Sequence, residues 1–121
     1  MLNSKTILVV DDDSIIRDFL VDFLRLEGYL VLQAENGEAA LKLFSANNVD
    51  LIIADFNMPN MNGAELFWAI QNIRHTRYVL ISGYFDPIQV STVIDAGAEF
   101  VEKPFQLQDL LQVVERTYNE V

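Results

Sequence analysis

Short apolar runs alternate with amphipathic segments along the whole chain. The runs cover residues 7–10, 29–34, 51–54, 78–81 and 100–101, and polar or turn-forming residues bound each of them. Short, nearly continuous apolar runs are typical of parallel strands that are covered on both faces. The pattern therefore predicts five buried parallel strands.

A helical pattern follows each predicted strand. Apolar residues recur every three or four positions within residues 15–24, 39–44, 66–73, 90–94 and 107–114, which predicts five helices with one face toward a core. The residues expected on those inner faces are Ile15, Ile16, Phe19, Leu20, Phe23, Leu24, Ala39, Ala40, Leu41, Leu43, Phe44, Leu66, Phe67, Ala69, Ile70, Ile73, Val90, Val93, Ile94, Leu107, Leu110, Leu111 and Val114. Trp68, Tyr78 and the eight phenylalanines are expected to lie mostly in the core as well.

Capping residues place the ends of these helices. Asp13 or Ser14 is expected to cap the first helix, and Asp86 followed by Pro87 is expected to begin the fourth. Gly28 and Gly97 stand where helices commonly end. Asn-Gly pairs at residues 36–37 and 62–63 precede the second and third helices.

Five strand–helix units in succession predict an α/β fold. Parallel strands with right-handed crossovers place helices on both faces of one sheet, and five units are too few for an eight-stranded barrel. We therefore expect a doubly wound, flavodoxin-like (βα)5 fold with strand order 2-1-3-4-5. Residues 1–121 are expected to form a single domain.

Composition narrows the classes of function. The 121 residues are 51% hydrophobic and carry 18 acidic against 8 basic side chains, for a net charge of −10. This charge argues against direct binding of nucleic acid or of an anionic membrane. The chain has no cysteine and one histidine, His75, which excludes thiol chemistry and multi-histidine metal sites. With no signal-peptide pattern or membrane span apparent, a cytoplasmic protein is expected.

Reactive side chains stand at the ends of four predicted strands. Asp11 and Asp12 follow the first, Asp55 the third, Ser82 the fourth and Lys103 the fifth. In the expected strand order these groups meet at one edge of the sheet. Carboxylates brought together there need a cation, and an all-oxygen ligand set favours Mg²⁺ or Mn²⁺. Such a site suits phosphoryl chemistry with a carboxylate as the nucleophile.

Four segments, residues 7–13, 55–63, 81–83 and 103–105, resemble the response-regulator receiver domain of bacterial two-component signalling. The resemblance implies that Asp55 accepts a phosphoryl group from a phosphohistidine on a sensor histidine kinase or phosphotransfer protein. It also implies that Asp11, Asp12, Asp55 and the backbone carbonyl of Asn57 hold Mg²⁺. Ser82 would bind a phosphoryl oxygen, and Lys103 would pair first with Asp55 and then with the phosphoryl group.

The resemblance further implies a switch rather than an enzyme. Phe100 stands at the position of the family's switch aromatic, and Pro104 at the position of a cis proline. Phosphorylation would draw Ser82 inward, allow Phe100 to rotate and change the surface of the fourth helix, fifth strand and fifth helix. A downstream protein, an attached output domain or a second copy of the chain would bind that surface.

Three other interpretations stay open at this point. The Asp11-x-Asp13 spacing also resembles the start of haloacid-dehalogenase-like phosphohydrolases, although those need additional segments. A flavodoxin-like cofactor binder would need a Gly-rich phosphate loop where three aspartates stand. A receiver fold could also serve only for docking. A receiver of this kind is either a protein on its own or part of a longer regulator.

Overall fold

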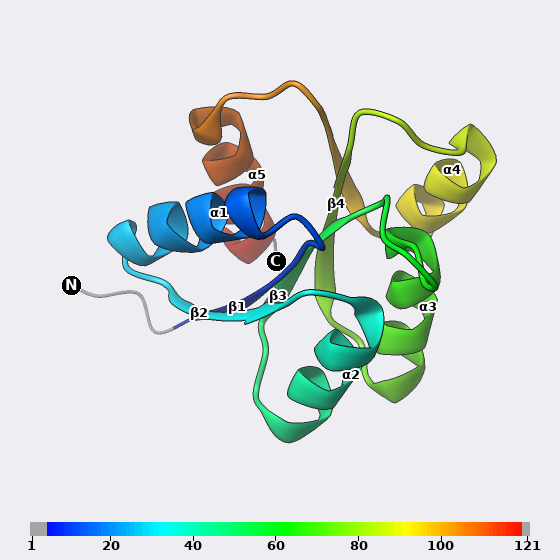
Figure 1. The fold of residues 1–121 in the computed structure, drawn as a ribbon, viewed down its shortest axis with the longest axis horizontal. Coiled ribbons are helices and arrows are strands. Elements are labelled where there is room, and N and C mark those ends of the chain that lie inside the picture. Colours follow the sequence, from blue (N-terminus) through cyan, green and yellow to red (C-terminus); the bar gives the residue numbers. More distant parts are fainter. Residues whose placement is uncertain (1–4, 120–121) are drawn as a thin grey trace.

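The computed structural model describes residues 5–119 and contains the five expected strand–helix units (Figure 1). In chain order the elements are β1 (Thr6–Val10), α1 (Ser14–Leu26), β2 (Leu30–Ala34), α2 (Gly37–Ala46), β3 (Leu51–Asp55), α3 (Gly63–Ile73), β4 (Arg77–Ser82), α4 (Pro87–Asp95), β5 (Glu99–Glu102) and α5 (Leu107–Asn119). Each strand lies within one or two residues of its predicted bounds. The sequence therefore predicts both the number and the order of the elements.

The five strands form one parallel sheet in the order β2-β1-β3-β4-β5, which confirms the predicted flavodoxin-like α/β topology. Helices α1 and α5 cover one face of the sheet, and α2, α3 and α4 cover the other (Figure 1). Two apolar cores result, one on each side of the sheet. Because all strands run the same way, their carboxyl ends meet at one edge.

Alternation along the strands divides the core residues between the two faces. Ile7, Val9 and Ile53 pack toward α1 and α5, whereas Leu8 and Ile52 pack toward α2, α3 and α4. Residues 7–10 on β1 and 51–54 on β3 are at most 1% exposed, as expected for central strands with helices on both sides. The edge strand β2 is different, since Leu30 at its start is 58% exposed.

The expected N-caps are present. Asp13 accepts hydrogen bonds from the backbone N–H groups of Ile15 and Ile16, and Asp86 does the same for α4. Asn62 and Glu65 form a reciprocal capping box at the start of α3. These caps fix where the helices begin, directly after the loops that carry the polar residues of the sheet edge.

Several predicted core positions are wrong. Ile15 and Phe19 are 80% and 61% exposed, because the apolar residues of α1 fill two adjacent rows and only the row with Leu20 and Leu24 faces the sheet. On the other helices, the exposed side chains that were expected inside are Trp68, Ile73 and Ile94. They lie on the outer flanks of α3 and α4, beyond the residues that contact the sheet. Within residues 5–119, no helix is both long enough and apolar enough to span a membrane.

Candidate functional site

Three carboxylates meet at the carboxyl edge of the central strands. Asp11 directly follows β1, Asp12 is the next residue, and Asp55 ends the neighbouring strand β3. One carboxylate oxygen from each of these residues lies within 4.8 Å of the others. The structure thus brings together the three acidic residues that the sequence placed at this edge.

Asp11 is anchored by hydrogen bonds and is almost completely buried. Its Oδ1 accepts a hydrogen bond from the backbone N–H of Asp13 at 2.9 Å, whereas its Oδ2 is buried and has no hydrogen-bond partner among residues 5–119. Arg17 donates from Nη1 to the Asp11 backbone carbonyl at 2.7 Å. Burial is the main cause that raises the pKa of Asp11 to about 6, and the neighbouring Asp55 adds to the shift.

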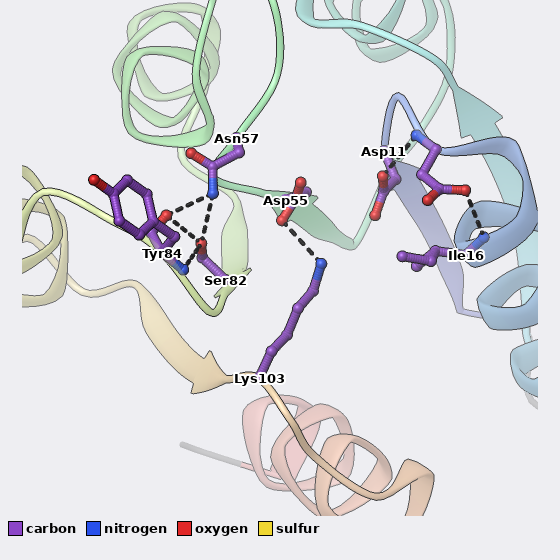
Figure 2. A network of polar contacts seen from close by, with 8 residues as sticks. Asp11, Ile16, Asp55, Asn57, Ser82, Tyr84 and Lys103 are labelled. Carbon is purple, nitrogen blue, oxygen red and sulfur yellow. Dashed lines mark hydrogen bonds and ion pairs between the residues drawn. The ribbon is translucent and has the colours of Figure 1, made fainter.

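Lys103 provides the positive charge of the site. It follows β5, and its Nζ lies 3.4 Å from Oδ1 of Asp55, as the resemblance implied for the unphosphorylated protein (Figure 2). Its backbone N–H donates to the carbonyl of Ser82 at 2.9 Å, and the bond to Pro104 is cis as expected. Burial raises the pKa of Asp55, and the ion pair with Lys103 partly offsets that effect.

The acidic cluster fits a hard divalent cation. All its donor atoms are oxygens, the three carboxylates repel one another, and Asp11 Oδ2 lacks any partner that would satisfy it. A buried, unpartnered carboxylate oxygen is costly, and a bound cation would remove that cost. Asp11, Asp12 and Asp55 are therefore consistent with a divalent metal site. The backbone carbonyl of Asn57 as a further ligand stays a prediction.

Ser82 lies on the side of Asp55 away from Asp11, and its hydroxyl is already hydrogen-bonded to Tyr84. Its buried hydroxyl donates to the backbone carbonyl of Tyr84 at 2.8 Å and accepts from the N–H of Tyr84 at 3.1 Å. The side-chain amide of Asn57 donates to both Ser82 Oγ and the Tyr84 carbonyl. Figure 2 shows this network beside the Asp55–Lys103 pair. No hydrogen bond between Ser82 and Asp55 occurs in the structure.

Phe100 lies on β5, the outer strand of the sheet, where it pairs with Leu80 of β4. Its ring is half-buried and packs edge-to-face on Phe85, with ring centroids 4.8 Å apart and an interplanar angle of 69°. Phe85 belongs to the loop between β4 and α4, only three residues after Ser82. The aromatic pair therefore connects that loop to β5.

Three contributors to the site were missed by the sequence interpretation: Arg17, the side chain of Asn57, and Phe85. A basic residue one turn into the first helix could have indicated Arg17. The side chain of Asn57 gave no signal, because its bonds cross between loops 25 and 27 residues apart. An aromatic residue close behind Ser82 could have indicated a partner for Phe100.

Comparison with known proteins identifies the family. The model of the response regulator receiver domain matches residues 7–115. The chain belongs to this family. Membership decides against the phosphohydrolase and cofactor-binding interpretations.

Relatives and solved structures agree with the receiver domain assignment. The chain is 34% identical to the chemotaxis protein CheY of Bacillus subtilis over 93% of this chain and 97% of that protein. A crystal structure of a response regulator receiver domain protein from Clostridium thermocellum aligns with a TM-score of 0.88 at 29% identity, covering 95% of this chain and 94% of that one.

Other relatives are much longer than this receiver domain. The chain is 35% identical over 96% of its length to a cyclic di-GMP phosphodiesterase of Thermotoga maritima, but it spans only 32% of that protein. It spans 17% of a CAI-1 autoinducer sensor kinase/phosphatase of Vibrio cholerae at 36% identity over 93% of its own length. Receiver domains of this family therefore occur within proteins of quite different output.

Proposed function

We propose that this receiver domain is a phosphoacceptor switch of two-component signalling, in which Asp55 receives a phosphoryl group from a phosphohistidine. The donor would be a sensor histidine kinase or a phosphotransfer protein. The observation that carries the proposal is the position of Asp55, between the carboxylates of Asp11 and Asp12 and the ammonium group of Lys103. Here residues 1–121 act as one receiver domain.

The transfer uses the carboxylate of Asp55 as the nucleophile. One of its oxygens forms a bond to phosphorus while the phosphorus–nitrogen bond to the histidine breaks, and the histidine nitrogen keeps the electron pair. The product is an aspartyl phosphate. Asp11, Asp12, Asp55 and the backbone carbonyl of Asn57 would hold Mg²⁺, or Mn²⁺ in its place, which supplies positive charge to the phosphoryl oxygens.

Lys103 and Ser82 then stabilise the new group. Phosphorylation adds roughly −1.5 to −2 units of charge at the site. Lys103 already lies 3.4 Å from Asp55, so a small movement lets its ammonium group pair with a phosphoryl oxygen. Ser82 exchanges its hydrogen bond to the Tyr84 carbonyl for one to another phosphoryl oxygen.

This exchange changes a distant surface. When Ser82 leaves Tyr84, the β4–α4 loop moves, and Phe85 releases the ring of Phe100 to rotate. The surface formed by α4, β5 and α5 is altered as a result. A downstream protein, an attached output domain or a second copy of the chain binds the altered surface, and these events are expected in the cytoplasm.

Phosphoryl uptake from acetyl phosphate tests the proposal. Intact-mass measurement is expected to detect one added phosphoryl group in the presence of Mg²⁺ and none with excess chelator. Asp55→Asn is expected to abolish uptake. Asp22→Asn, which removes the same charge from the exposed face of α1, is the matched control and is expected to retain uptake. Undiminished labelling of Asp55→Asn would overturn the proposal.

A further inference from the structure

The hydroxyl group of Ser82 has no hydrogen-bonding capacity left in the unphosphorylated structure. A serine hydroxyl can donate one hydrogen bond and accept two. Ser82 donates to the Tyr84 carbonyl and accepts from both the Tyr84 N–H and the Asn57 side chain. It can therefore reach a group on Asp55 only by giving up one of these bonds.

The amide of Asn57 completes this network. Both of its N–H bonds are used, one toward Ser82 Oγ at 3.1 Å and one toward the Tyr84 carbonyl. Four donated hydrogen bonds are thus matched by four lone pairs, two on Ser82 and two on the Tyr84 carbonyl. The side chain of Asn57 connects the loop after β3 with the loop after β4.

We propose that the side-chain amide of Asn57 is a positioning group that holds Ser82 and the β4–α4 loop in the unphosphorylated arrangement and so opposes switching. The effect on switching rests on the function proposed above, whereas the restraint on the loop does not. The amide acts through Ser82 and Tyr84 and need not contact the phosphoryl group.

The hydrogen bonds of Asn57 also restrain Phe100, through the backbone that connects Tyr84 to Phe85. The Tyr84 carbonyl that Asn57 holds belongs to the peptide unit that leads into Phe85, and the ring of Phe85 packs on Phe100. A groove of about 540 Å³ lies beside Asn57, Tyr84 and Phe85, at the start of α4. The loop has open space to enter once the hydrogen bonds to Asn57 are broken.

A second side-chain bridge crosses the same groove without touching Ser82. Asn62 donates from Nδ2 to Oε1 of Gln89 on α4 at 3.0 Å. Replacing Gln89 therefore removes one bond between the same two regions and leaves the Ser82 network intact. Gln89→Leu is the matched control for Asn57→Leu. The Asn57→Leu substitution keeps the size and branching of the side chain and the backbone carbonyl, but it removes both N–H donors of the amide.

The test begins without Mg²⁺ or a phosphoryl donor. Hydrogen exchange at the Tyr84 amide, measured by NMR, is expected to be about tenfold faster in Asn57→Leu, as for the loss of one to two hydrogen bonds. Asn57→Asp, which has the shape of asparagine but no N–H donors, is expected to show the same increase. Gln89→Leu is expected to stay within twofold of the wild type. An unchanged exchange rate of the Tyr84 amide in both Asn57 variants would contradict the proposed restraint of the loop by Asn57.

The second measurement adds Mg²⁺ and beryllofluoride, a mimic of the phosphoryl group. Asn57→Leu is expected to reach half-saturation at a several-fold lower beryllofluoride concentration, and its Phe100 ring signals are expected to lie closer to the saturated wild type before addition. Faster exchange with an unchanged midpoint and unchanged Phe100 signals would overturn the effect on switching. A wild-type protein that never responds to beryllofluoride would instead contradict the proposed function, while the exchange rates still decide the restraint.

Discussion

Replacing Asp11 with asparagine is expected to stabilise the metal-free protein and to abolish its stabilisation by Mg²⁺. The asparagine side chain would keep an oxygen for the Asp13 N–H but would remove a buried charge whose second oxygen has no partner. It would also remove the repulsion from Asp55. The substitution therefore separates the contribution of the acidic cluster to stability from its contribution to metal binding.

The structure sets the size of the effect. Two unit charges 4.8 Å apart, the upper separation of the cluster oxygens, repel by roughly 3.5 kcal/mol at an effective dielectric constant of about 20. The rise in the pKa of Asp11 from 3.8 to about 6 corresponds to about 3 kcal/mol for all its causes together, of which burial is the largest and the repulsion by Asp55 only one part. Lys103 offsets part of the repulsion at Asp55, and the asparagine amide has its own cost of burial. We therefore expect a net gain of about 1–2 kcal/mol near neutral pH.

Urea unfolding, followed by far-ultraviolet circular dichroism with and without Mg²⁺, measures both effects. The wild type is expected to gain roughly 2.7 kcal/mol when Mg²⁺ is present at a hundred times its dissociation constant, whereas Asp11→Asn is expected to gain almost nothing. Asp22→Asn is the control for a change in net charge alone. A less stable metal-free Asp11→Asn protein, or one that Mg²⁺ stabilises as strongly as the wild type, would refute this reasoning.

Three other outcomes are expected. Gly63→Ala is expected to lower the free energy of unfolding, measured in urea, by about 2 kcal/mol, because the added Cβ would lie 2.5 Å from both the Asp55 backbone oxygen and Leu80 Cδ1. An unchanged midpoint of urea unfolding would contradict this close packing. In the absence of metal, thermal unfolding is expected to show that the stability of the protein falls as the pH rises from about 4 to about 6. The raised pKa of Asp11 causes this fall, because the folded chain binds more protons than the unfolded chain in this pH range. A stability that rises over this range would contradict the direction of the pKa shift assigned to Asp11. Lys103→Ala is expected to retain Mg²⁺ binding, measured by calorimetry, but to lose most of the phosphoryl-dependent shift in NMR signals, and an undiminished shift would contradict its role.

The fold could be predicted from the sequence because local signals agree with one another. Continuous apolar runs indicate buried parallel strands, and the caps at Asp13, Asn62 and Asp86 begin helices where the apolar pattern changes period. The predicted faces were less accurate. Ile15 and Phe19 have the spacing of core residues, but the sheet covers only one row of α1.

The site could be predicted only as far as strand order dictates it. Residues at the carboxyl ends of the strands of one parallel sheet meet at the same edge, so the placement of Asp11, Asp55 and Lys103 there follows from the topology. The hydrogen bonds of Asn57 do not, because they depend on how two irregular loops lie relative to each other. No periodicity or spacing in the sequence reports that arrangement.

Locating the phosphoryl group on the chain tests the central claim most directly. The protein is incubated with acetyl phosphate and Mg²⁺, the acyl phosphate is reduced with borohydride, and the modified residue is located by tandem mass spectrometry. Conversion to homoserine is expected at Asp55 and at no other aspartate. Conversion at Asp11 or Asp12, or no conversion under conditions that label another receiver domain, would contradict it.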